Sequence, residues 1–364
     1  MPAKRIVFTI TNDPVTDQRM IRIAGALHGA GYRVCLVGRR LRPLPVNHLP
    51  FKTVRLPAWW RKGPLQYVEC NLRIFCWLLF HKADLVCAID LDTILPVYCI
   101  SRLRGIPRVY DAHEYFSQLP EVIRRPAIQR WWLAIERFSL PRFPNGYTVS
   151  QSIAEAFHRQ YGVRYGVIRN LPRYSFQPAT PPPAPLLLYQ GAINEGRGLE
   201  QLIPAMKEIP AVLHLYGDGN FLEKAKELVR AHQLEEKVIF KGVLPPGDLQ
   251  QVTRRYTAGI NLVAREGLNQ YYSLANKFFD YMQAGLPQLT MDFPEYRRVN
   301  EQYEVALLIP APETEAIATA LNHLLTDGVL YMRLAQNCRA ASQQYCWEKE
   351  EHLLLSMYQS FFRS

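Results

Sequence analysis

The feature that most constrains this chain is a repeated alternation between short apolar runs and segments with helical spacing. Residues 5–10 form a predicted buried strand, residues 18–30 a helix closed by Gly31, and residues 33–37 a second strand. This β-α-β order builds parallel sheets. The same alternation starts again after residue 185, so the chain contains two such series. We therefore predict an α/β protein with two doubly wound, Rossmann-like domains.

A proline-rich stretch divides the two series. Residues 173–185 end in Thr-Pro-Pro-Pro-Ala-Pro, a composition typical of a stiff linker. We therefore expect a first domain at residues 1–172 and a second domain at residues 186–344. Residues 345–364 carry large apolar side chains at roughly helical spacing, which predicts a C-terminal helix.

Composition and charge narrow the class of protein. Apolar residues make up 48% of the 364 residues, so each domain can bury a core. The net charge is +11, and the excess of lysine and arginine lies in residues 1–170. A basic surface attracts nucleic acid, anionic lipid or a phosphorylated substrate. Because we find no nucleic-acid-binding motif, we expect no nucleic-acid partner.

Cysteine usage and hydropathy indicate the compartment. Seven cysteines, none in a paired spacing, predict reduced thiols and a cytoplasmic location. The chain begins Met-Pro-Ala-Lys and enters a strand at Arg5, so we expect no signal peptide. The longest apolar candidate, Ile74–Phe80, is too short to span a bilayer, and any membrane contact would be peripheral.

Residues 56–80 combine aromatic side chains with cations and allow two interpretations. Such a mixture suits the interface of an anionic membrane, and the residues concerned are Trp59, Trp60, Arg61 and Lys62. The alternative is a helix packed in the core after a tryptophan-rich loop. The helical spacing predicts one inward row, made of Leu72, Phe75, Cys76 and Leu79.

Residues 272–287 are predicted to form a helix with a defined start and stop. Ser273 is expected to cap the N-terminus, and Gly285 to take the left-handed position after the last turn. One side is apolar and predicted to be buried, with Leu274, Phe278, Tyr281 and Met282. The other side carries polar groups, namely Ser273, Asn276, Lys277 and Asp280.

The polar side of this helix suits a nucleoside diphosphate. Helix N-termini attract anions, so the phosphates would lie at Ser273 and Lys277 and the ribose hydroxyls at Asp280. The alternative is a solvated amphipathic helix in which lysine and aspartate pair at a spacing of three residues.

Other polar loops follow predicted strands in the second half. Residues 190–198 place glycines around Arg197 before a helix, which is the outline of a phosphate-binding loop. Gly217 and Asp218 form a turn at the same predicted sheet edge. The alternative is a glycine turn with a solvated arginine.

The first half also places polar groups where strands end. Open α/β sheets bind ligands at the carboxyl ends of their strands. The first strand leads to Asn12, Asp13 and Arg19, and a later strand leads to Asp111, His113 and Glu114. The alternatives are turns, helix caps and a structural contact between the aspartate and the histidine.

Two strings carry a resemblance to a known family. Ser-x-x-Asn-Lys-x-Phe-Asp-Tyr-x-x-Ala-Gly-x-Pro, at residues 273–287, resembles the donor-site helix of retaining glycosyltransferases of family 4, in the variant written "SLPNKLFEY". Tyr-Asp-Ala-His-Glu, at residues 110–114, resembles the "YDxHE" segment of the same variant. The resemblance implies the GT-B fold, in which two Rossmann-like domains face each other across a cleft and a final helix returns toward the first domain.

The implied activity is transfer of a sugar from a nucleotide-sugar donor to a glycan or lipid-linked acceptor, with retention at the anomeric carbon and without a metal or cofactor. The resemblance assigns His113 to the sugar or the attacking hydroxyl, and Arg197 and Lys277 to the diphosphate. The other implied donor-binding residues are Gly191, Gly217, Asp218, Lys241, Gly242, Ser273, Asn276 and Asp280. The implied acceptor-side residues are Asn12, Asp13, Arg19, Asp111 and Glu114.

One position departs from the family pattern. Where the family has the first of two acids, this chain has Tyr272. Glu266 is a candidate substitute for a contact with the sugar, or an ordinary loop glutamate. Asp90 and Asp92 have the spacing of a metal-binding pair but lie in the half of the chain expected to bind the acceptor, and we do not assign a metal to them.

Two rival functions remain open. A nucleotide-sugar epimerase shares the implied fold, but its first half should carry several acids, and this first half is rich in arginine. A non-catalytic nucleotide-binding subunit is favoured by Tyr272. A screen of nucleotide sugars for diphosphate release, with and without acceptor, distinguishes the three.

Overall fold

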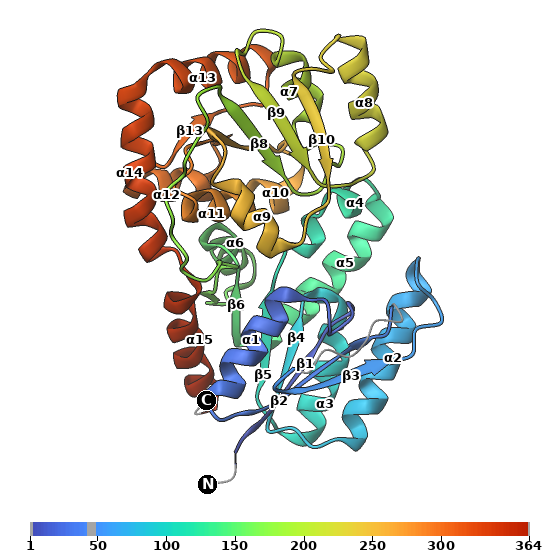
Figure 1. Ribbon diagram of the computed structural model, residues 1–364. Helices are drawn as coiled ribbons and strands as arrows, with labels where there is room; N and C mark the ends of the chain where they lie inside the picture. The colour runs from blue at the N-terminus through green and yellow to red at the C-terminus, as the bar shows by residue number, and fades with distance from the viewer. Residues whose placement is uncertain (1–2, 42–48, 363–364) are drawn as a thin grey trace. The chain divides into compact units, whose positions relative to one another are not determined.

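The chain folds into two compact units (Figure 1). The computed structural model describes residues 3–41 and 49–362, so the first two residues, on which part of the signal-peptide expectation rests, lie outside it. Unit 1 takes in residues 1–170 and 350–364, and unit 2 residues 171–349.

The expected linker forms part of unit 2. The N–H groups of Gln177 and Thr180 donate to the carbonyls of Gln283 and Arg254 at 3.2 and 2.8 Å. The proline stretch is therefore fixed against unit 2 by backbone hydrogen bonds.

Unit 1 is built on a seven-stranded sheet, sheet A, in the order β3-β2-β1-β4-β5-β6-β7. Every neighbouring pair is parallel, as the predicted β-α-β series requires. The strands are β1 (Arg5–Thr9), β2 (Arg33–Arg39), β3 (Lys52–Leu56), β4 (Leu85–Ile89), β5 (Arg108–Ala112), β6 (Asn145–Thr148) and β7 (Gly166–Val167).

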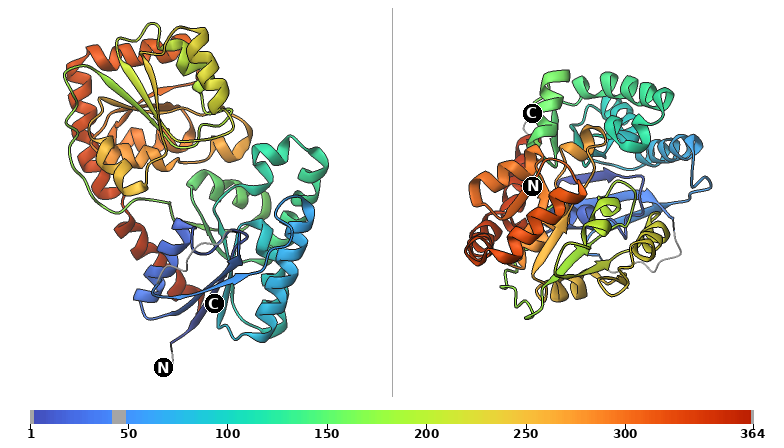
Figure 2. Two further views of the ribbon diagram at one scale, coloured as in Figure 1. Left: turned by 45° about the vertical axis from the view of Figure 1, so that its right-hand side comes forward. Right: turned by 90° about the horizontal axis from the view of Figure 1, so that it is seen from above.

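Helices cover both faces of sheet A (Figure 2). Those of unit 1 are α1 (Gln18–Gly29), α2 (Pro64–Phe80), α3 (Ile94–Arg104), α4 (Pro120–Ile123), α5 (Pro126–Ser139) and α6 (Gln151–Tyr161). The last helix, α15 (Trp347–Phe361), belongs to unit 1 from residue 350 onward. Its Tyr358 is fully buried, with ring centroids 6.0 Å from Phe8 of β1 and 6.1 Å from Tyr147 of β6.

The predicted inward row of α2 is wrong. Leu72, Cys76 and Leu79 are exposed, whereas Ile74 and Leu78 are buried. Apolar residues occupy both sides of this helix, so apolar spacing alone does not select the buried side.

Two polar residues of α2 explain which side is buried. Asn71 donates to the Asp92 carbonyl at 2.7 Å. Buried Glu69 accepts the N–H groups of Trp59 and Trp60 at 3.0 and 2.9 Å. These polar side chains find partners within the fold, and they hold the helix with its second apolar row outward.

Unit 2 is built on a six-stranded parallel sheet, sheet B, in the order β10-β9-β8-β11-β12-β13. Its strands are β8 (Leu186–Gln190), β9 (Val212–Tyr216), β10 (Val238–Gly242), β11 (Ala258–Asn261), β12 (Gln288–Met291) and β13 (Ala306–Ile309). Its helices are α7 (Leu199–Ala205), α8 (Leu222–Ala231), α9 (Pro246–Thr253), α10 (Gly267–Tyr271), α11 (Asn276–Gln283), α12 (Pro294–Tyr303), α13 (Thr314–Thr326) and α14 (Gly328–Gln344).

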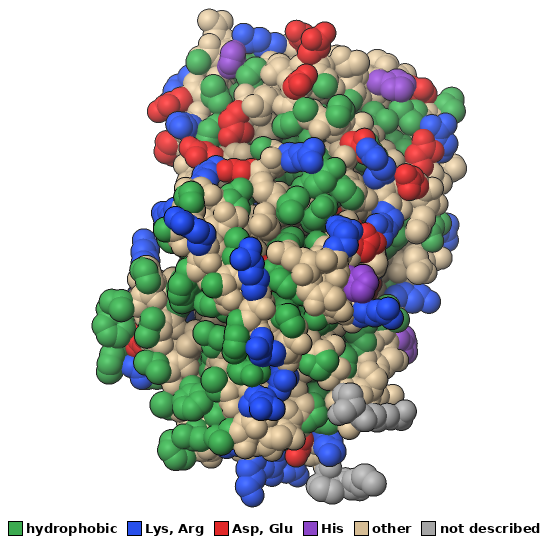
Figure 3. Space-filling model, turned by 180° about the vertical axis from the view of Figure 1, so that it is seen from behind, with side chains coloured by type: hydrophobic (Ala, Val, Ile, Leu, Met, Phe, Trp, Pro, Cys, Tyr) green, Lys and Arg blue, Asp and Glu red, His purple; other side chains and the backbone are tan. Residues whose placement is uncertain are grey.

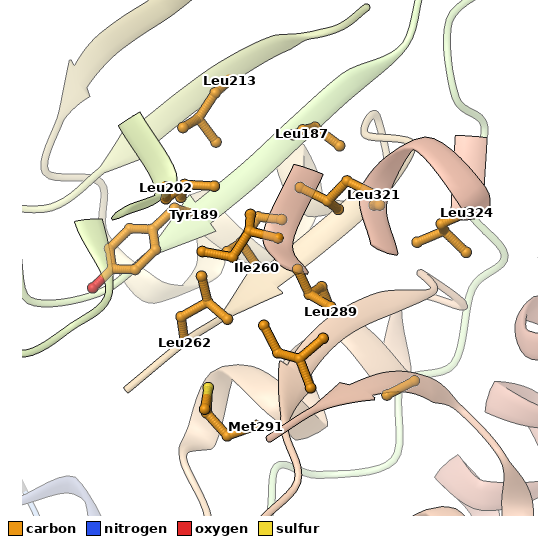
Figure 4. Close-up of a cluster of buried hydrophobic side chains, with 14 of the residues drawn as sticks. Leu187, Tyr189, Leu202, Leu213, Ile260, Leu262, Leu289, Met291, Leu321 and Leu324 are labelled. Atoms are coloured by element: carbon orange, nitrogen blue, oxygen red, sulfur yellow. The ribbon is translucent and has the colours of Figure 1, made fainter. Parts of the chain in front are cut away.

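A leucine-rich core joins sheet B to the helices on one of its faces (Figure 4). Leu187, Leu213 and Ile260 point from the strands toward Leu202 of α7 and Leu321 of α13, and all five are fully buried. Burial of each such side chain contributes about 1.5–3 kcal/mol. This packing fixes the strands whose carboxyl ends carry the candidate site.

Candidate functional site

Three glycines meet at the carboxyl edge of sheet B. Gly191 follows β8, Gly217 follows β9, and Gly242 ends β10. The Gly191 N–H donates to the Tyr216 carbonyl, and the Gly217 N–H donates to the Gly242 carbonyl, each at 2.9 Å. A Cβ at Gly217 would overlap the Gly191 carbonyl oxygen, and the φ of Gly217 is +149°, so this position requires glycine.

The loop between β8 and α7 carries Arg197. The Ala264 N–H donates to the Gly196 carbonyl at 2.8 Å, which joins this loop to the segment after β11. Arg197 is half-buried, and its positive charge acts on Lys277 and Tyr296. The guanidinium therefore lies on the side of the loop that meets α11 and α12.

Lys277, in the first turn of α11, points back toward Gly191 and the end of β8. Its ammonium lies 3.8 Å from the centroid of the Tyr189 ring, at the end of β8. A Cβ built at Gly191 would stand 3.7 Å from the lysine Nζ. Burial and the nearby Arg197 guanidinium lower the pKa of Lys277 to about 7, although the Asp280 carboxylate opposes the shift.

Two cations thus share one corner of unit 2. Two like charges in a poorly solvated place repel each other. Together with burial, this repulsion lowers the pKa of Lys277. A bound anion would relieve the repulsion. Glycine backbone, a guanidinium and an ammonium are the groups with which proteins hold phosphates.

Asp280 lies one turn further along α11, and its carboxylate is bound by the side chain of Gln190 at the end of β8. The Gln190 Nε2 donates to Asp280 Oδ2 at 3.0 Å, while its Oε1 accepts from the Thr253 hydroxyl at 3.1 Å. Gln190 is buried, so its amide keeps one orientation. No sequence motif indicates a role for Gln190 by itself; its place directly before Gly191 is the available signal.

The predicted start of the helix is wrong by two residues, since the N-cap is Ala275 and not Ser273. Helix α11 begins at Asn276, and no side chain caps it. The Ser273 hydroxyl instead donates to the Gln270 carbonyl at 2.9 Å, because Ser273 lies just after the short helix α10. Asn276 is exposed on the first turn of α11.

The predicted stop is confirmed. Gly285 has a φ of +63°. Its N–H donates to the Met282 carbonyl at 3.0 Å, and the Leu286 N–H donates to the Tyr281 carbonyl at 2.9 Å. These two bonds form a Schellman motif.

Glu266 and Tyr272 bracket α10. Glu266 precedes the helix, and a Cβ at Gly196 would lie 3.9 Å from its Oε2, so this carboxylate faces the Arg197 loop. Tyr272 follows the helix, with its ring centroid 5.4 Å from that of Tyr271. The structure thus supplies an acid at this edge from a position six residues before Tyr272.

Asp218 and Lys241 lie on the outer part of the same edge. Asp218 is exposed, and its Oδ1 accepts from the Gly219 N–H at 2.7 Å. Lys241 is exposed on the edge strand β10, where the register with β9 shifts. Burial, and then the charge of Lys241, lower the pKa of His214, so Lys241 acts on β9.

In unit 1, the carboxyl edge of sheet A carries a histidine, a carboxylate and a guanidinium in contact. His113 Nε2 lies 3.1 Å from Asp111 Oδ2, and Arg19 donates to Asp111 Oδ1 at 3.2 Å. Burial alone would raise the pKa of Asp111, but His113 and Arg19 hold it below its ordinary value. Burial alone would lower the pKa of His113, but Asp111 outweighs it and the pKa is raised.

Asp90 fixes the backbone of this segment. Its Oδ1 accepts from the N–H groups of His113 and Glu114 at 2.8 and 3.2 Å. The φ and ψ of Asp90 are 56° and 174°, a backbone conformation that residues other than glycine rarely adopt. Burial raises the pKa of this carboxyl group well above its ordinary value. The spacing of Asp90 and Asp92 suggests only a metal pair, and this positioning role of Asp90 is visible only in the fold.

Asn12, Asp13 and Glu114 are the other residues of unit 1 predicted to bind the acceptor. The Asp13 carboxylate is bound by Arg55, whose Nη2 and Nε donate at 2.6 and 2.9 Å, and by the Leu41 N–H at 3.1 Å. Asp13 thus joins its loop to β3, and its contact with an acceptor stays a prediction. Asn12 and Glu114 are exposed at the edge of the sheet.

Within residues 3–41 and 49–362, no group of three or more histidine, cysteine or acidic side chains is arranged to hold a metal ion. None of the helices in those ranges combines the length and the apolar composition needed to cross a membrane.

Comparisons with known proteins agree with this architecture. Residues 17–173 match the model described as Glycosyltransferase Family 4, and residues 172–341 match the model described as Glycosyl transferases group 1. A lipopolysaccharide core biosynthesis glycosyltransferase, LpsE of Rhizobium meliloti, is 25% identical over 158 residues. That match spans less than half of either protein, 43% of this chain and 44% of the relative.

Solved structures show the same fold over nearly the whole chain. The sucrose-phosphate synthase of Thermosynechococcus elongatus aligns with a TM-score of 0.80 at 20% identity, covering 99% of both chains. Anabaena HepE, in complex with UDP and glucose, aligns with a TM-score of 0.77 at 17% identity, covering 98% of this chain and 99% of that one. The two model matches adjoin and together take in residues 17–341, so the first half of the chain is similar to Glycosyltransferase Family 4, the second half is similar to Glycosyl transferases group 1, and the whole has the GT-B fold.

Proposed function

We propose that this glycosyltransferase moves a sugar from a nucleoside diphosphate donor to a glycan or lipid-linked acceptor, with retention of the anomeric configuration and without a metal ion. The observation that carries the proposal is the pairing of Arg197 with the low-pKa Lys277 beside the glycine edge of sheet B. Complexes of HepE with UDP and with UDP-glucose support a nucleotide-sugar donor.

The two cations would act on the leaving group. As the bond from the anomeric carbon to the phosphate oxygen breaks, negative charge grows on the diphosphate. Arg197 and Lys277 would stabilise that charge as it develops. The acceptor oxygen forms the new bond on the same face, and its proton passes to the departing phosphate oxygen, so no protein nucleophile is needed.

Neighbouring groups would orient the donor. Asp280, fixed by Gln190, would accept hydrogen bonds from the ribose hydroxyls. Glu266, beside the Arg197 loop, would contact the sugar in place of the acid that the family pattern has at the position of Tyr272. On unit 1, His113 would bind a sugar or acceptor hydroxyl through its second ring nitrogen, with Asp111 holding the first.

The acceptor and location form the remaining part of the proposal. The name of LpsE, a lipopolysaccharide core enzyme, and the basic character of residues 1–170 support a glycan or lipid-linked acceptor at the inner face of a membrane. The protein would then be cytoplasmic and peripherally bound, and its string at residues 273–287 would place it in the "SLPNKLFEY" variant.

The test combines turnover with stereochemistry. UDP-, GDP- and other nucleotide sugars are screened for diphosphate release with acceptor glycans and lipids, and the anomeric configuration of the product is determined by NMR. We expect release that depends on acceptor, retention of configuration, and loss of at least about a hundredfold in turnover for Arg197→Ala. An inverted product, or equal activity of the variant, contradicts the mechanism.

A non-catalytic nucleotide-binding subunit is the second candidate, because Tyr272 stands where relatives of this kind carry an acid. It predicts nucleotide binding without turnover of any donor. Glu266→Gln distinguishes the two: it lowers turnover in an enzyme that uses Glu266 on the sugar, and it leaves UDP binding unchanged in both cases.

A further inference from the structure

The outward side of α2 is apolar along its whole length. Leu65, Val68, Leu72, Cys76 and Leu79 recur every three or four residues, so they form one stripe, and all are exposed. The exposed fraction reaches 60% at Leu72 and 81% at Phe80, at the end of the helix. A surface helix normally turns polar side chains to water, whereas this helix presents a second apolar side.

Two neighbouring helices extend the apolar stripe of α2. Helix α3 is tied to α2 where Arg104 donates to the Leu79 carbonyl at 2.7 Å, and to α5 through the rings of Tyr98 and Phe138, 5.4 Å apart. The exposed apolar residues that they add are Leu103, Ile128, Trp131 and Phe138. Hydrophobic side chains gather over this part of unit 1 at the lower left of Figure 3. We call this surface the α2–α3–α5 face.

Cations outnumber carboxylates around the α2–α3–α5 face, although Glu121 of the neighbouring helix α4 is an exposed acid. The three helices contain two acidic residues, Glu69 and Glu136, and both are buried. The exposed basic residues on the helices and the segments next to them are Arg61, Lys62, Lys82, Arg102, Arg130 and Arg137. Trp59, beside α2, is stacked on Arg73 at 4.3 Å.

This pattern selects the partner. Contact between two copies of the chain through this face would bring two basic frames together, which is unfavourable. An anionic bilayer offers hydrocarbon to the apolar stripe and phosphates to the cations, and tryptophan favours the boundary between them. We propose that the α2–α3–α5 face docks on an anionic membrane, with the apolar side chains inserted below the phosphate groups. The inference rests on the peripheral membrane contact proposed above, but not on the transfer chemistry.

Vesicle flotation tests the face directly. Full-length protein is mixed with vesicles of phosphatidylcholine and phosphatidylglycerol, or of phosphatidylcholine alone. We expect binding to the anionic vesicles, and a loss of at least about tenfold in affinity for Leu72→Glu and for Trp131→Glu. The matched control is Val329→Glu on α14 of unit 2, where the side chain is 78% exposed, and it should bind like the wild type.

Salt and oligomeric state complete the test. High salt should weaken binding without abolishing it, because salt screens the cations but not the inserted apolar groups. Wild-type binding by both glutamate variants would overturn the proposal. So would a wild-type dimer that Leu72→Glu dissociates in sedimentation velocity, since the face would then be a subunit contact.

Misfolding is excluded by measuring UDP binding and the melting temperature on the same preparations. Leu72 is exposed, so both should match the wild type. Failure of UDP binding in every preparation, with vesicle binding intact, would count against the proposed function and leave the membrane face standing.

Discussion

At the scale of single residues, the two units keep charged groups in environments that shift their pKa values toward neutrality. Lys277 and Asp92 are the clearest cases, since the pKa of each lies at about 7, one lowered and one raised by burial. They have opposite consequences, because protonation charges the lysine and neutralises the aspartate.

Lys277 should make donor affinity depend on pH. A diphosphate binds the charged ammonium, so affinity is constant below pH 7 and falls as pH rises above 7, by up to about tenfold per pH unit. Titration calorimetry with a nucleotide sugar from pH 6 to 9 measures this. Lys277→Arg keeps the charge at all these values and should flatten the profile; an equally steep profile in that variant would refute the assignment.

Gln190 should matter through Asp280. Gln190→Leu removes the hydrogen bond to the Asp280 carboxylate and should weaken binding of UDP by about tenfold. Binding of 2′,3′-dideoxy-UDP, which lacks the hydroxyls that Asp280 would hold, should change little. Equal losses for both ligands, measured by calorimetry, would show a general disruption of the site.

Asp92 should make stability depend on pH. Its folded-state pKa of about 7 lies above the ordinary aspartate value, so its contribution is complete below about pH 4 and is lost as pH rises through 7. Asp92→Asn, which can still accept from the Thr11 hydroxyl, should stabilise unit 1 at pH 8 by about 1–4 kcal/mol and much less at pH 5. Urea unfolding at both pH values measures the difference, and equal effects would contradict the linkage.

At the scale of elements, the carboxyl edge of sheet B depends on glycines at or just after the ends of β8, β9 and β10, which lie close enough to share backbone hydrogen bonds. Gly217 is the tightest of these positions, because its Cα faces the Gly191 carbonyl. The edge therefore tolerates no side chain there without moving one loop.

Gly217→Ala should disrupt this edge. We expect a loss of about 1–3 kcal/mol in stability and at least about tenfold in UDP affinity, because the Gly191 loop must shift. Gly247→Ala, on α9 of the same unit, is the control, since a Cβ there meets nothing within 4 Å. Thermal unfolding and calorimetry of the two variants should differ; similar behaviour would show that the close approach is unimportant.

The sequence predicts elements better than it predicts their exposed and buried sides. Buried parallel strands are continuous apolar runs and were recognised as such, and Gly285 marked a helix end through its own backbone chemistry. The predicted cap at Ser273 is wrong because a serine hydroxyl can bind a carbonyl at the end of one helix as readily as an N–H at the start of the next. The buried side of α2 depends on partners of Glu69 and Asn71 that lie elsewhere in the chain. The spacing of residues within the helix cannot predict those partners.

The candidate site shows the same division. Arg197, Lys277 and the three glycines belong to short strings that the sequence displays. Gln190 and Asp90 act by holding another residue, and only the fold shows which residue that is.

At the scale of the whole molecule, the chain passes from unit 1 to unit 2 and returns at residue 350. Helix α15 then completes unit 1. Tyr358 is buried against β1 and β6, and buried Glu350 accepts from the Arg169 N–H at 2.9 Å. The stability of unit 1 therefore depends on a segment that follows unit 2 in the chain.

Tyr358→Ala should destabilise unit 1 by about 3–5 kcal/mol and leave UDP binding by unit 2 unchanged. Five of the six tryptophans lie in unit 1, so urea unfolding followed by tryptophan fluorescence reports on it. Leu353→Ala, on the exposed side of the same helix, is the control and should have little effect. A loss of UDP binding with Tyr358→Ala would show that the units do not fold as separate bodies.

The return of the chain also orders events during synthesis. Unit 2 is one uninterrupted segment and can fold as soon as it leaves the ribosome, whereas sheet A lacks the helix that covers Phe8 and Tyr147 until α15 has been translated as well. Most of unit 1 is therefore translated before unit 2 but completed after it. Phe8 and Tyr147 stay uncovered by α15 for the time needed to translate unit 2.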